Sequence, residues 1–242
     1  MARVRADTLL VSRGLCESRA KAAAAIAAGG VTVNGVAVRK AAELLEDDAP
    51  IEVRQAHPWV SRGGVKLAAA LDAFAIDPAG RDCLDIGAST GGFTDVLLSR
   101  GAAHVTCVDV GHSQLHPKIG DDPRVTSLEK TDARGLNSSQ IGPAPSLIVV
   151  DASFISLALV LPPVLALASQ GAILVALVKP QFEVGPDHVK KGVVRDEALR
   201  AQACAKIETL VKSLGWRRIG LIPSPIDGGD GNREYLLAAE RS

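Results

Sequence analysis

The chain has 242 residues, of which 47% are hydrophobic and 22% are charged. This composition is that of one or two globular domains with a core, and it excludes disordered and fibrous chains. The 27 basic and 27 acidic residues cancel, which excludes a protein that binds polyanions over its whole surface, so any nucleic-acid site must be regional.

The cysteines and the N-terminus indicate the compartment. Cys16, Cys83, Cys107 and Cys204 lie far apart without a C-x-x-C pair, so we expect neither a disulfide nor a metal site. The first residues lack the long apolar stretch of a secretory signal. Both observations favour a cytoplasmic protein.

Residues 1 to 55 carry the pattern of a small α+β domain. The spacing of apolar residues predicts two short helices, with Ser18 as the N-cap of the second and Gly29-Gly30 at its end. Asn34-Gly35 between two valine-rich runs predicts a two-residue hairpin turn.

The strings S-R-x-x-A from Ser18 and G-x-V-x-V-N-G from Gly29 resemble the S4 RNA-binding domain, over about residues 3 to 54. The resemblance implies that the second helix and the adjoining loop face RNA. Each residue alone is also typical of a solvated surface, so phosphate contact is one of two interpretations. The RNA-contact candidates are Arg3, Arg5, Arg13, Ser18, Arg19, Lys21, Asn34, Arg39 and Lys40.

Residues 56 to 63 are expected to link this domain to the next one, because Pro58 breaks a helix and Gly63-Gly64 precede a new helical pattern. Trp59 in this linker has two interpretations. It either packs into a core or exposes a surface on which a base can stack.

From residue 64 to 242, helical and strand patterns alternate. The alternation predicts a doubly wound, mostly parallel α/β sheet with its ligand over the carboxyl ends of the strands. The predicted strands end at Asp85, Asp109, near Leu128, at Val150 and at Val178, and Glu234 lies in the last strand.

Residues 152 to 178 contain no charged side chain, and the run is long enough to resemble a membrane span. Pro162-Pro163 interrupt it, and Ser169-Gln170-Gly171 form a polar turn. We therefore expect a short buried helix, a turn and a central parallel strand that is apolar on both faces.

The segment from Asp85 to Phe93 is expected to be a ligand-binding turn between a strand and a helix. Its small residues let the backbone approach a ligand, and the helix start at Phe93 offers unpaired amides. These residues are Gly87, Ala88, Ser89, Gly91 and Gly92.

Two carboxylates bear on the identity of the ligand. Asp109 closes the next strand about twenty residues on, where it is expected to take both ribose hydroxyls, a feature that NAD enzymes share. The turn reads D-x-G-x-x-x-G-G-F instead of G-x-G-x-x-G, and Asp85 ahead of the first glycine is suited to an ammonium group. S-adenosylmethionine has such a group.

Lys66, Asp151, Lys179 and Glu234 stand around this turn in a fixed order. The order resembles the Lys-Asp-Lys-Glu tetrad of RNA ribose 2′-O-methyltransferases of the FtsJ/RrmJ type, which have a class I (Rossmann-like) fold with a seven-stranded sheet. The resemblance implies S-adenosylmethionine as cofactor and Lys179 as general base. It also implies that Asp132 receives the adenine amine, whereas the residues alone are equally compatible with a loop cap.

The chemistry of the tetrad explains these residue types. A ribose 2′-hydroxyl is a poor nucleophile unless a base takes its proton, and a lysine is a base only when neutral. Burial and a neighbouring cation favour the neutral form, so we expect Lys66 to lie against Lys179. Asp151 and Glu234 would hold the two amines. Each member taken singly also has a structural explanation as a helix surface residue, a strand-end cap or an ion-pair partner.

The combination of an S4 domain and an FtsJ-like domain closely resembles the TlyA family, often labelled haemolysin. The family implies methylation of cytidine 2′-hydroxyls in ribosomal RNA, and the short C-terminus resembles the branch that modifies the large subunit only. The loop 180 to 195 is expected to be a substrate lid. The alternatives are a membrane-active haemolysin and a non-catalytic S4 protein bound to ribosomes. The oligomeric state does not follow from the sequence.

Overall fold

The computed structural model describes residues 3–16, 18–27, 29–53 and 57–242. The chain divides into two compact units, Met1–Pro58 and Trp59–Ser242. The expected linker, residues 56 to 63, begins at a residue outside the described ones and ends in the second unit.

The first unit has the small α+β fold that was predicted. Strand β1 pairs with β4, and β2 pairs with β3 and β5, all antiparallel. Two helices pack on these strands through a core that includes Leu10, Ile26 and Val31. The elements are β1 (Arg3–Arg5), α1 (Ala6–Ser12), α2 (Arg19–Ala27), β2 (Val31–Val33), β3 (Val36–Ala37), β4 (Leu44–Glu46) and β5 (Ile51–Val53).

The local signals in this unit act as predicted. Asn34 and Gly35 have positive φ angles of 51° and 76° and join β2 to β3, as a two-residue hairpin turn of type I′ requires. The Lys21 amide donates to Ser18 Oγ over 3.2 Å, which makes Ser18 the cap of α2.

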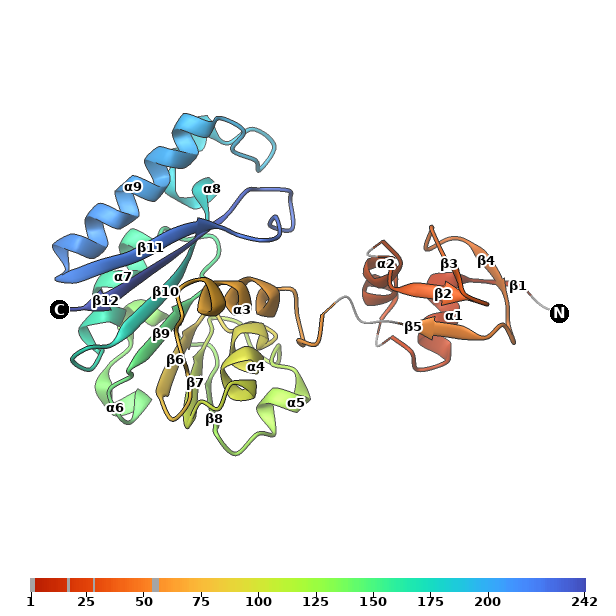
Figure 1. The fold of residues 1–242 in the computed structure, drawn as a ribbon, viewed down its shortest axis with the longest axis horizontal. Coiled ribbons are helices and arrows are strands. Elements are labelled where there is room, and N and C mark those ends of the chain that lie inside the picture. Colours follow the sequence, from red (N-terminus) through yellow and green to blue (C-terminus); the bar gives the residue numbers. More distant parts are fainter. Residues whose placement is uncertain (1–2, 17, 28, 54–56) are drawn as a thin grey trace. The chain divides into compact units, whose positions relative to one another are not determined.

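The second unit is a doubly wound α/β domain (Figure 1). Its helices alternate with the strands along the chain, as the pattern predicted. The elements are α3 (Gly63–Ala73), β6 (Asp82–Ile86), α4 (Gly92–Ser99), β7 (His104–Val108), α5 (Pro117–Gly120), β8 (Val125–Leu128), η1 (Ala133–Gly135), α6 (Ser138–Ile141), β9 (Leu147–Val150), α7 (Leu157–Ala166), β10 (Ile173–Val178), α8 (Pro180–Glu183), η2 (Pro186–His188), α9 (Glu197–Ser213), β11 (Trp216–Pro223) and β12 (Tyr235–Arg241).

The sheet of this unit has seven strands in the order β11-β12-β10-β9-β6-β7-β8. It is mostly parallel, since only β12 runs antiparallel to its neighbours. Glu234 immediately precedes β12 instead of lying within it. Because β12 is reversed and Val178 pairs with Tyr235, the start of β12 lies beside the end of β10.

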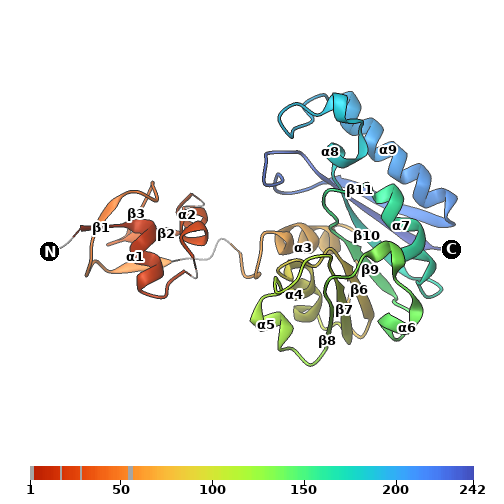
Figure 2. The ribbon, with the colours of Figure 1, turned by 180° about the vertical axis from the view of Figure 1, so that it is seen from behind.

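Both faces of the sheet are covered by helices, as Figures 1 and 2 show from opposite sides. Alternate side chains of β9 point to opposite faces of the sheet. Ile148 and Val150 belong to the core that includes α7 and α9. Leu147 and Val149 belong to the core that includes α3 and α4. All four residues of β9 are buried. Burial on both faces explains why the parallel strands read as continuous apolar runs.

The uncharged run 152 to 178 folds into α7, a turn and β10. The helix, turn and strand were predicted, but Pro162 and Pro163 lie inside α7 and do not end it. Strand β10 is parallel to β9 and antiparallel to β12. Within the described residues, no helix is both long and apolar enough to cross a membrane.

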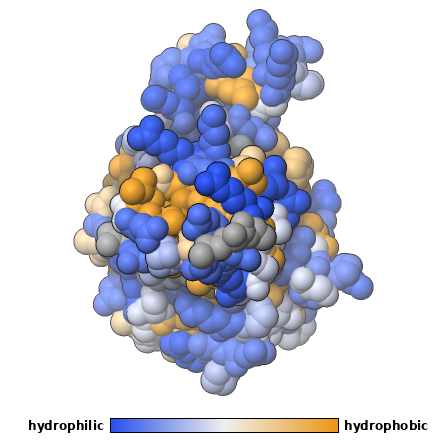
Figure 3. Space-filling view, turned by 90° about the vertical axis from the view of Figure 1, so that its right-hand side faces the viewer, coloured by the Kyte–Doolittle hydropathy of each residue, from blue (hydrophilic) through white to orange (hydrophobic). Residues whose placement is uncertain are grey.

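Most of the surface drawn in Figure 3 is hydrophilic, with hydrophobic residues in separate areas between the polar ones. Phe154 is an exposed hydrophobic residue, with 91% of its surface accessible to solvent. An exposed aromatic side chain of this kind marks a candidate contact surface.

Candidate active site

The turn between β6 and α4 lies against the end of β9. Gly87 has φ +82°, and a Cβ atom on it would come within 2.6 Å of the Asp151 backbone oxygen. Its amide donates to the Val108 carbonyl at the end of β7 over 2.8 Å. Only glycine permits this close approach of two backbones at a positive φ angle.

Asp85 is fully buried beneath the turn. Its Oδ2 accepts a hydrogen bond of 2.6 Å from Thr94 Oγ1, in the first turns of α4. Burial is the main cause that raises the pKa of Asp85 to about 7, and the Thr94 hydrogen bond opposes it. Asp85 does not line the pocket described below, so the expected direct contact with a ligand's ammonium group finds no support in its position.

The raised pKa predicts a specific pH dependence of stability. A carboxyl whose pKa is higher in the folded than in the unfolded state loses stabilisation as pH rises through the interval between the two values, here from about 4 to about 7. Asp85→Asn removes this titration, so the variant should gain stability over wild type between pH 4 and pH 8 by up to about 4 kcal/mol. Denaturant unfolding at both pH values measures the difference, and an equal difference at the two pH values would contradict the assignment.

Asp109 follows β7 and holds two backbone amides. Its carboxylate oxygens accept hydrogen bonds from the amides of Ser89 (2.8 Å) and Gly111 (2.7 Å). It lines a narrow depression together with Gln114 and Glu129. The depression shares Ala88 and Ser89 with the main pocket, so the two are adjacent.

Asp132 occupies a different environment from the one expected of an adenine ligand. It caps the short helix η1 by accepting from the Arg134 amide, and it forms an ion pair of 2.6 Å with the Arg134 guanidinium. Arg134 lowers the pKa of Asp132 to about 2. This geometry is that of the loop cap, the second of the two interpretations drawn from the sequence.

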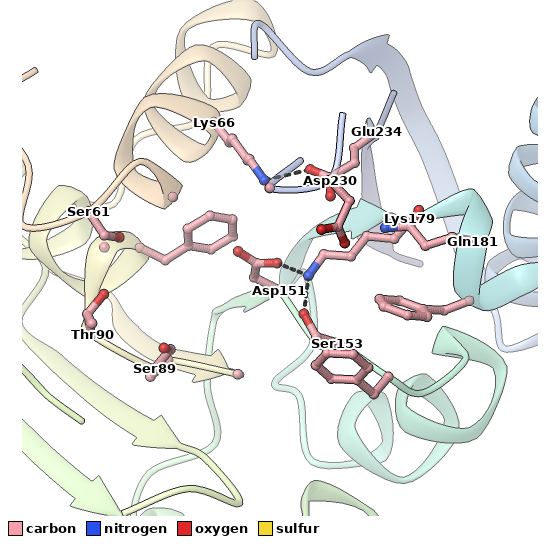
Figure 4. A pocket seen from close by; sticks show the side chains of 18 of the residues that line it. Ser61, Lys66, Ser89, Thr90, Asp151, Ser153, Lys179, Gln181, Asp230 and Glu234 are labelled. Carbon is pink, nitrogen blue, oxygen red and sulfur yellow. Dashed lines mark hydrogen bonds and ion pairs between the residues drawn. The ribbon is translucent and has the colours of Figure 1, made fainter. Parts of the chain in front are cut away.

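The main pocket has a volume of about 430 Å³ and brings the four predicted catalytic residues together. Two lysine–carboxylate pairs face it (Figure 4). Lys179 Nζ lies 2.6 Å from Asp151 Oδ1, and Lys66 Nζ lies 2.5 Å from Glu234 Oε2. The pocket therefore holds two amines, each paired with its own carboxylate.

The topology explains how residues so far apart in sequence meet. Asp151 and Lys179 follow the parallel strands β9 and β10, and the reversed strand β12 places Glu234 at the same edge. Lys66 reaches the pocket from α3. The carboxyl edge of an open parallel sheet is the usual ligand site.

The contacts of Lys66 and Lys179 differ from the expected arrangement. Both residues are largely buried, at 8% and 7% exposure. Each of the two amines contacts a carboxylate, and Lys179 Nζ also donates a hydrogen bond of 2.6 Å to Ser153 Oγ.

Several pocket residues were not predicted from the sequence. Ser61, Ser153, Phe154 and Phe182 all line it. Phe154 has φ +63°, a conformation that bulky residues rarely adopt, and its ring centroid lies 5.4 Å from that of Phe182. The apolar string around Phe154 could be noticed in the sequence, but no local signal reveals its exposure.

Glu183 at the end of α8 was also missed. Its buried carboxylate accepts from Ser156 Oγ (2.6 Å) and the Leu157 amide (2.7 Å), and lies 3.1 Å from Lys206 Nζ. It thus ties the segment after Asp151 to the segment after Lys179. A buried carboxylate with three donors is a rigid brace for both.

The first unit uses several of the RNA-contact candidates internally. Arg5 and Arg19 both form ion pairs with the buried Asp7, at 3.0 and 2.9 Å, and these contacts hold the pKa of Asp7 well below its usual range. Arg13 donates to the backbone oxygens of Asp47 and Ala49. The remaining candidates Arg3, Asn34, Arg39 and Lys40 lie partly or fully at the surface.

Comparisons with known proteins agree with this architecture. Residues 59–241 match the model of the FtsJ-like methyltransferases, and residues 4–51 match that of the S4 domain. The fold and the matches define a methyltransferase that carries an S4 domain.

Individual relatives narrow the class. The chain is 50% identical to the 16S/23S rRNA (cytidine-2′-O)-methyltransferase TlyA of Mycobacterium tuberculosis, over 97% of this chain and 89% of the relative. It is 39% identical to the 23S rRNA (cytidine-2′-O)-methyltransferase TlyA of Campylobacter jejuni, over 74% and 69%. A Streptococcus thermophilus structure, named as a candidate hemolysin, superposes with a TM-score of 0.79 at 38% identity, covering 100% of this chain and 90% of that one. The chain belongs to the TlyA family of FtsJ-like methyltransferases.

Proposed function

We propose that the protein transfers a methyl group from S-adenosylmethionine to the 2′-hydroxyl of a cytidine ribose in ribosomal RNA. The observation that carries the proposal is the pair of buried lysine–carboxylate contacts around one pocket, Lys179 with Asp151 and Lys66 with Glu234. The names of both TlyA relatives describe this reaction and support the choice of substrate.

The residues of the pocket fit S-adenosylmethionine. A volume of about 430 Å³ falls within the range of about 300–1,000 Å³ that is typical of small-molecule sites. Gly87, Ser89 and Asp109 would hold the cofactor, with the Asp109 carboxylate toward the ribose. When bound, the cofactor supplies a methyl group that its sulfonium already activates, so the protein needs no covalent intermediate.

Lys179 acts as the general base in this proposal. Its Nζ, held by Asp151 and Ser153 Oγ, would take the proton of the 2′-hydroxyl as the hydroxyl oxygen bonds to the donated methyl carbon and the sulfur–carbon bond breaks, with S-adenosylhomocysteine as the leaving group. Lys66, fixed by Glu234, faces the same pocket and orients the ribose.

Two other groups complete the substrate site. Phe154, exposed at the pocket, offers an aromatic face to the target base. The S4 domain binds RNA phosphates through Lys21, Arg39 and Lys40, while Arg5 and Arg19 support its fold through Asp7.

We assign the large ribosomal subunit as substrate, because 23S rRNA appears in the names of both TlyA relatives and 16S rRNA in only one. A ribosomal substrate implies a cytoplasmic location. The test is incubation of purified protein and S-adenosylmethionine with unmodified large and small subunits, followed by mass spectrometry of the RNA. A 2′-O-methylcytidine in 23S rRNA is expected. Methylation elsewhere than on a ribose, or of 16S rRNA alone, would contradict the assignment.

The alternatives rest on weaker observations. A non-catalytic ribosome-binding protein would not need all four tetrad side chains at one pocket. A membrane-active haemolysin is suggested by the names of relatives and by the uncharged run 152 to 178, which folds into a short helix and a strand of the sheet. Release of haemoglobin from erythrocytes by the purified protein, together with absent methylation, would favour the haemolysin.

The position assigned to the cofactor predicts the effect of Asp109→Ala. The variant lacks the carboxylate that would accept hydrogen bonds from the ribose hydroxyls. It also loses the hydrogen bonds that this carboxylate accepts from two backbone amides. S-adenosylmethionine binding should weaken by roughly 1.5–3 kcal/mol. Calorimetry measures the affinity, with Asp72→Ala as the control for an exposed carboxylate of the same domain that lines neither pocket. Equal affinities of the Asp109 variant and wild type for S-adenosylmethionine would contradict this placement of the ribose.

A further inference from the structure

The segment after α8 forms a tight turn at the mouth of the pocket. Lys190 and Val193 exchange two backbone hydrogen bonds of 3.1 Å each, and Lys191 and Gly192 between them have φ angles of 51° and 80°. These values define a two-residue hairpin turn. Val189 and Gly192 line the pocket, so the turn that carries the two lysines lies at its rim.

Asn232 holds this turn in place. Its side chain is buried at 1% exposure, and both ends of the amide are used. Nδ2 donates to the Gly192 carbonyl (2.7 Å), and Oδ1 accepts from the amide of the buried Val194 (3.0 Å). Asn232 lies two residues before Glu234, so the turn is fixed to the segment that carries a tetrad residue.

The charge of the turn is not neutralised locally. Lys190, Lys191 and Arg195 are exposed, and among the ion pairs of the described residues none involves them. In contrast, Arg134, Arg124 and Arg217 are each paired with a carboxylate. The segment 185 to 195 contains three cations against one acid, Asp187.

The pocket has one acidic group on its rim besides the tetrad. Asp230, exposed, points its side chain into the pocket between Lys66 and Lys179 (Figure 4). The net charge of the protein is zero. Cations at the rim of the pocket that have no ion-pair partner among the described residues therefore create a local positive potential, which attracts anions.

We propose that Lys190 and Lys191 bind backbone phosphates of the RNA next to the target nucleotide, and that Asn232 is the positioning residue for this contact. The inference rests on the proposed function, because it requires a ribose in the pocket. Phosphates adjoin every ribose of an RNA strand. Cations at the rim of a ribose-binding pocket can therefore contact these phosphates whatever the nucleotide sequence of the RNA. The site would supplement the S4 domain and set the register of the strand.

The first test compares lysine variants of the turn with a lysine variant elsewhere in the domain, and Lys191→Gln matches the control in charge change. Lys190→Gln/Lys191→Gln should weaken RNA binding roughly tenfold at 0.1 M salt and lower the slope of log affinity against log salt by about 1.5. Lys191→Gln should give about half of that change in slope. The control is Lys212→Gln, an exposed lysine in the last turn of α9, about 22 Å along the helix from Glu197.

The kinetic readout separates this role from catalysis. Both lysine variants should raise the KM for RNA and leave kcat and the affinity for S-adenosylmethionine within about twofold of wild type. Asn232→Ala should shift KM in the same direction, because the turn loses both side-chain hydrogen bonds. If Asn232→Ala does not fold, the exposed lysine variants carry the test alone.

The outcomes distinguish this inference from the proposed function. If wild type methylates RNA, and the double lysine variant has the same affinity and salt slope as Lys212→Gln, the phosphate site is wrong and the methyltransferase stands. If wild type does not methylate, but the lysine variants still lose RNA affinity and slope, the RNA contact stands and the assigned reaction fails. A loss of kcat with unchanged KM would also overturn the phosphate role.

Discussion

Lys179→Ala is expected to lower the methylation rate at least about a hundredfold while cofactor and RNA binding persist. The reason is that Lys179 Nζ, 2.6 Å from both Asp151 and Ser153 Oγ, is the group assigned to remove the 2′-hydroxyl proton. Binding relies on other residues, so the loss should appear in kcat. Single-turnover kinetics with saturating RNA and S-adenosylmethionine measures it.

Lys179→Arg distinguishes a base from a charge. A guanidinium keeps its proton throughout the accessible pH range, so the arginine variant should fail as severely as the alanine variant. Lys212→Ala is the matched control for removal of a lysine from the same domain. An arginine variant with near wild-type rate would show that Lys179 only neutralises charge.

The sheet could be predicted from the sequence because its strands are buried on both faces. Runs such as Leu147–Val150 and Ile173–Val178 are apolar without interruption, and each ends next to a polar residue at the pocket. Asn34-Gly35 form the predicted hairpin turn, and Ser18 caps the predicted helix. Local signals and long apolar runs are the features that a single sequence carries most strongly.

The partners of the charged residues could not be predicted in the same way. The tetrad members were identified, but the pairing of Lys66 with Glu234, 168 residues away, depends on how β12 is placed beside β10. Likewise, Asp132 meets Arg134 two residues away, and Asp85 lies under the turn and not in the pocket. Pro162 and Pro163 fit inside α7, although local propensity favours a break. Tertiary packing, which no local pattern specifies, decided the positions of the Lys66–Glu234 pair, of Asp85 and of the two prolines, whereas the contact between Asp132 and Arg134 is local.

Gly87→Ala is expected to impair the enzyme through the backbone alone. The residue has φ +82°, which costs an L-residue about 1–2 kcal/mol, and its Cβ would lie 2.6 Å from the Asp151 carbonyl oxygen and 2.9 Å from the carbonyl carbon. The turn and the end of β9 must therefore move apart. Since Asp151 holds Lys179, a displacement of about 1 Å should cost roughly a hundredfold in rate, and S-adenosylmethionine should bind more weakly.

Gly80→Ala is the matched control for this substitution. Gly80 has a similar φ of +69°, but a Cβ there meets no atom within 4 Å, so the control carries the conformational cost without the collision. Both variants should lose similar thermal stability from the backbone conformation, and only Gly87→Ala should also lose rate and cofactor affinity. Equal rates for the two variants would mean that the turn does not need to lie against Asp151. The contact between the turn and β9 would then serve folding, and the alignment of Lys179 with its substrate would have to come from Ser153 and Glu183 instead.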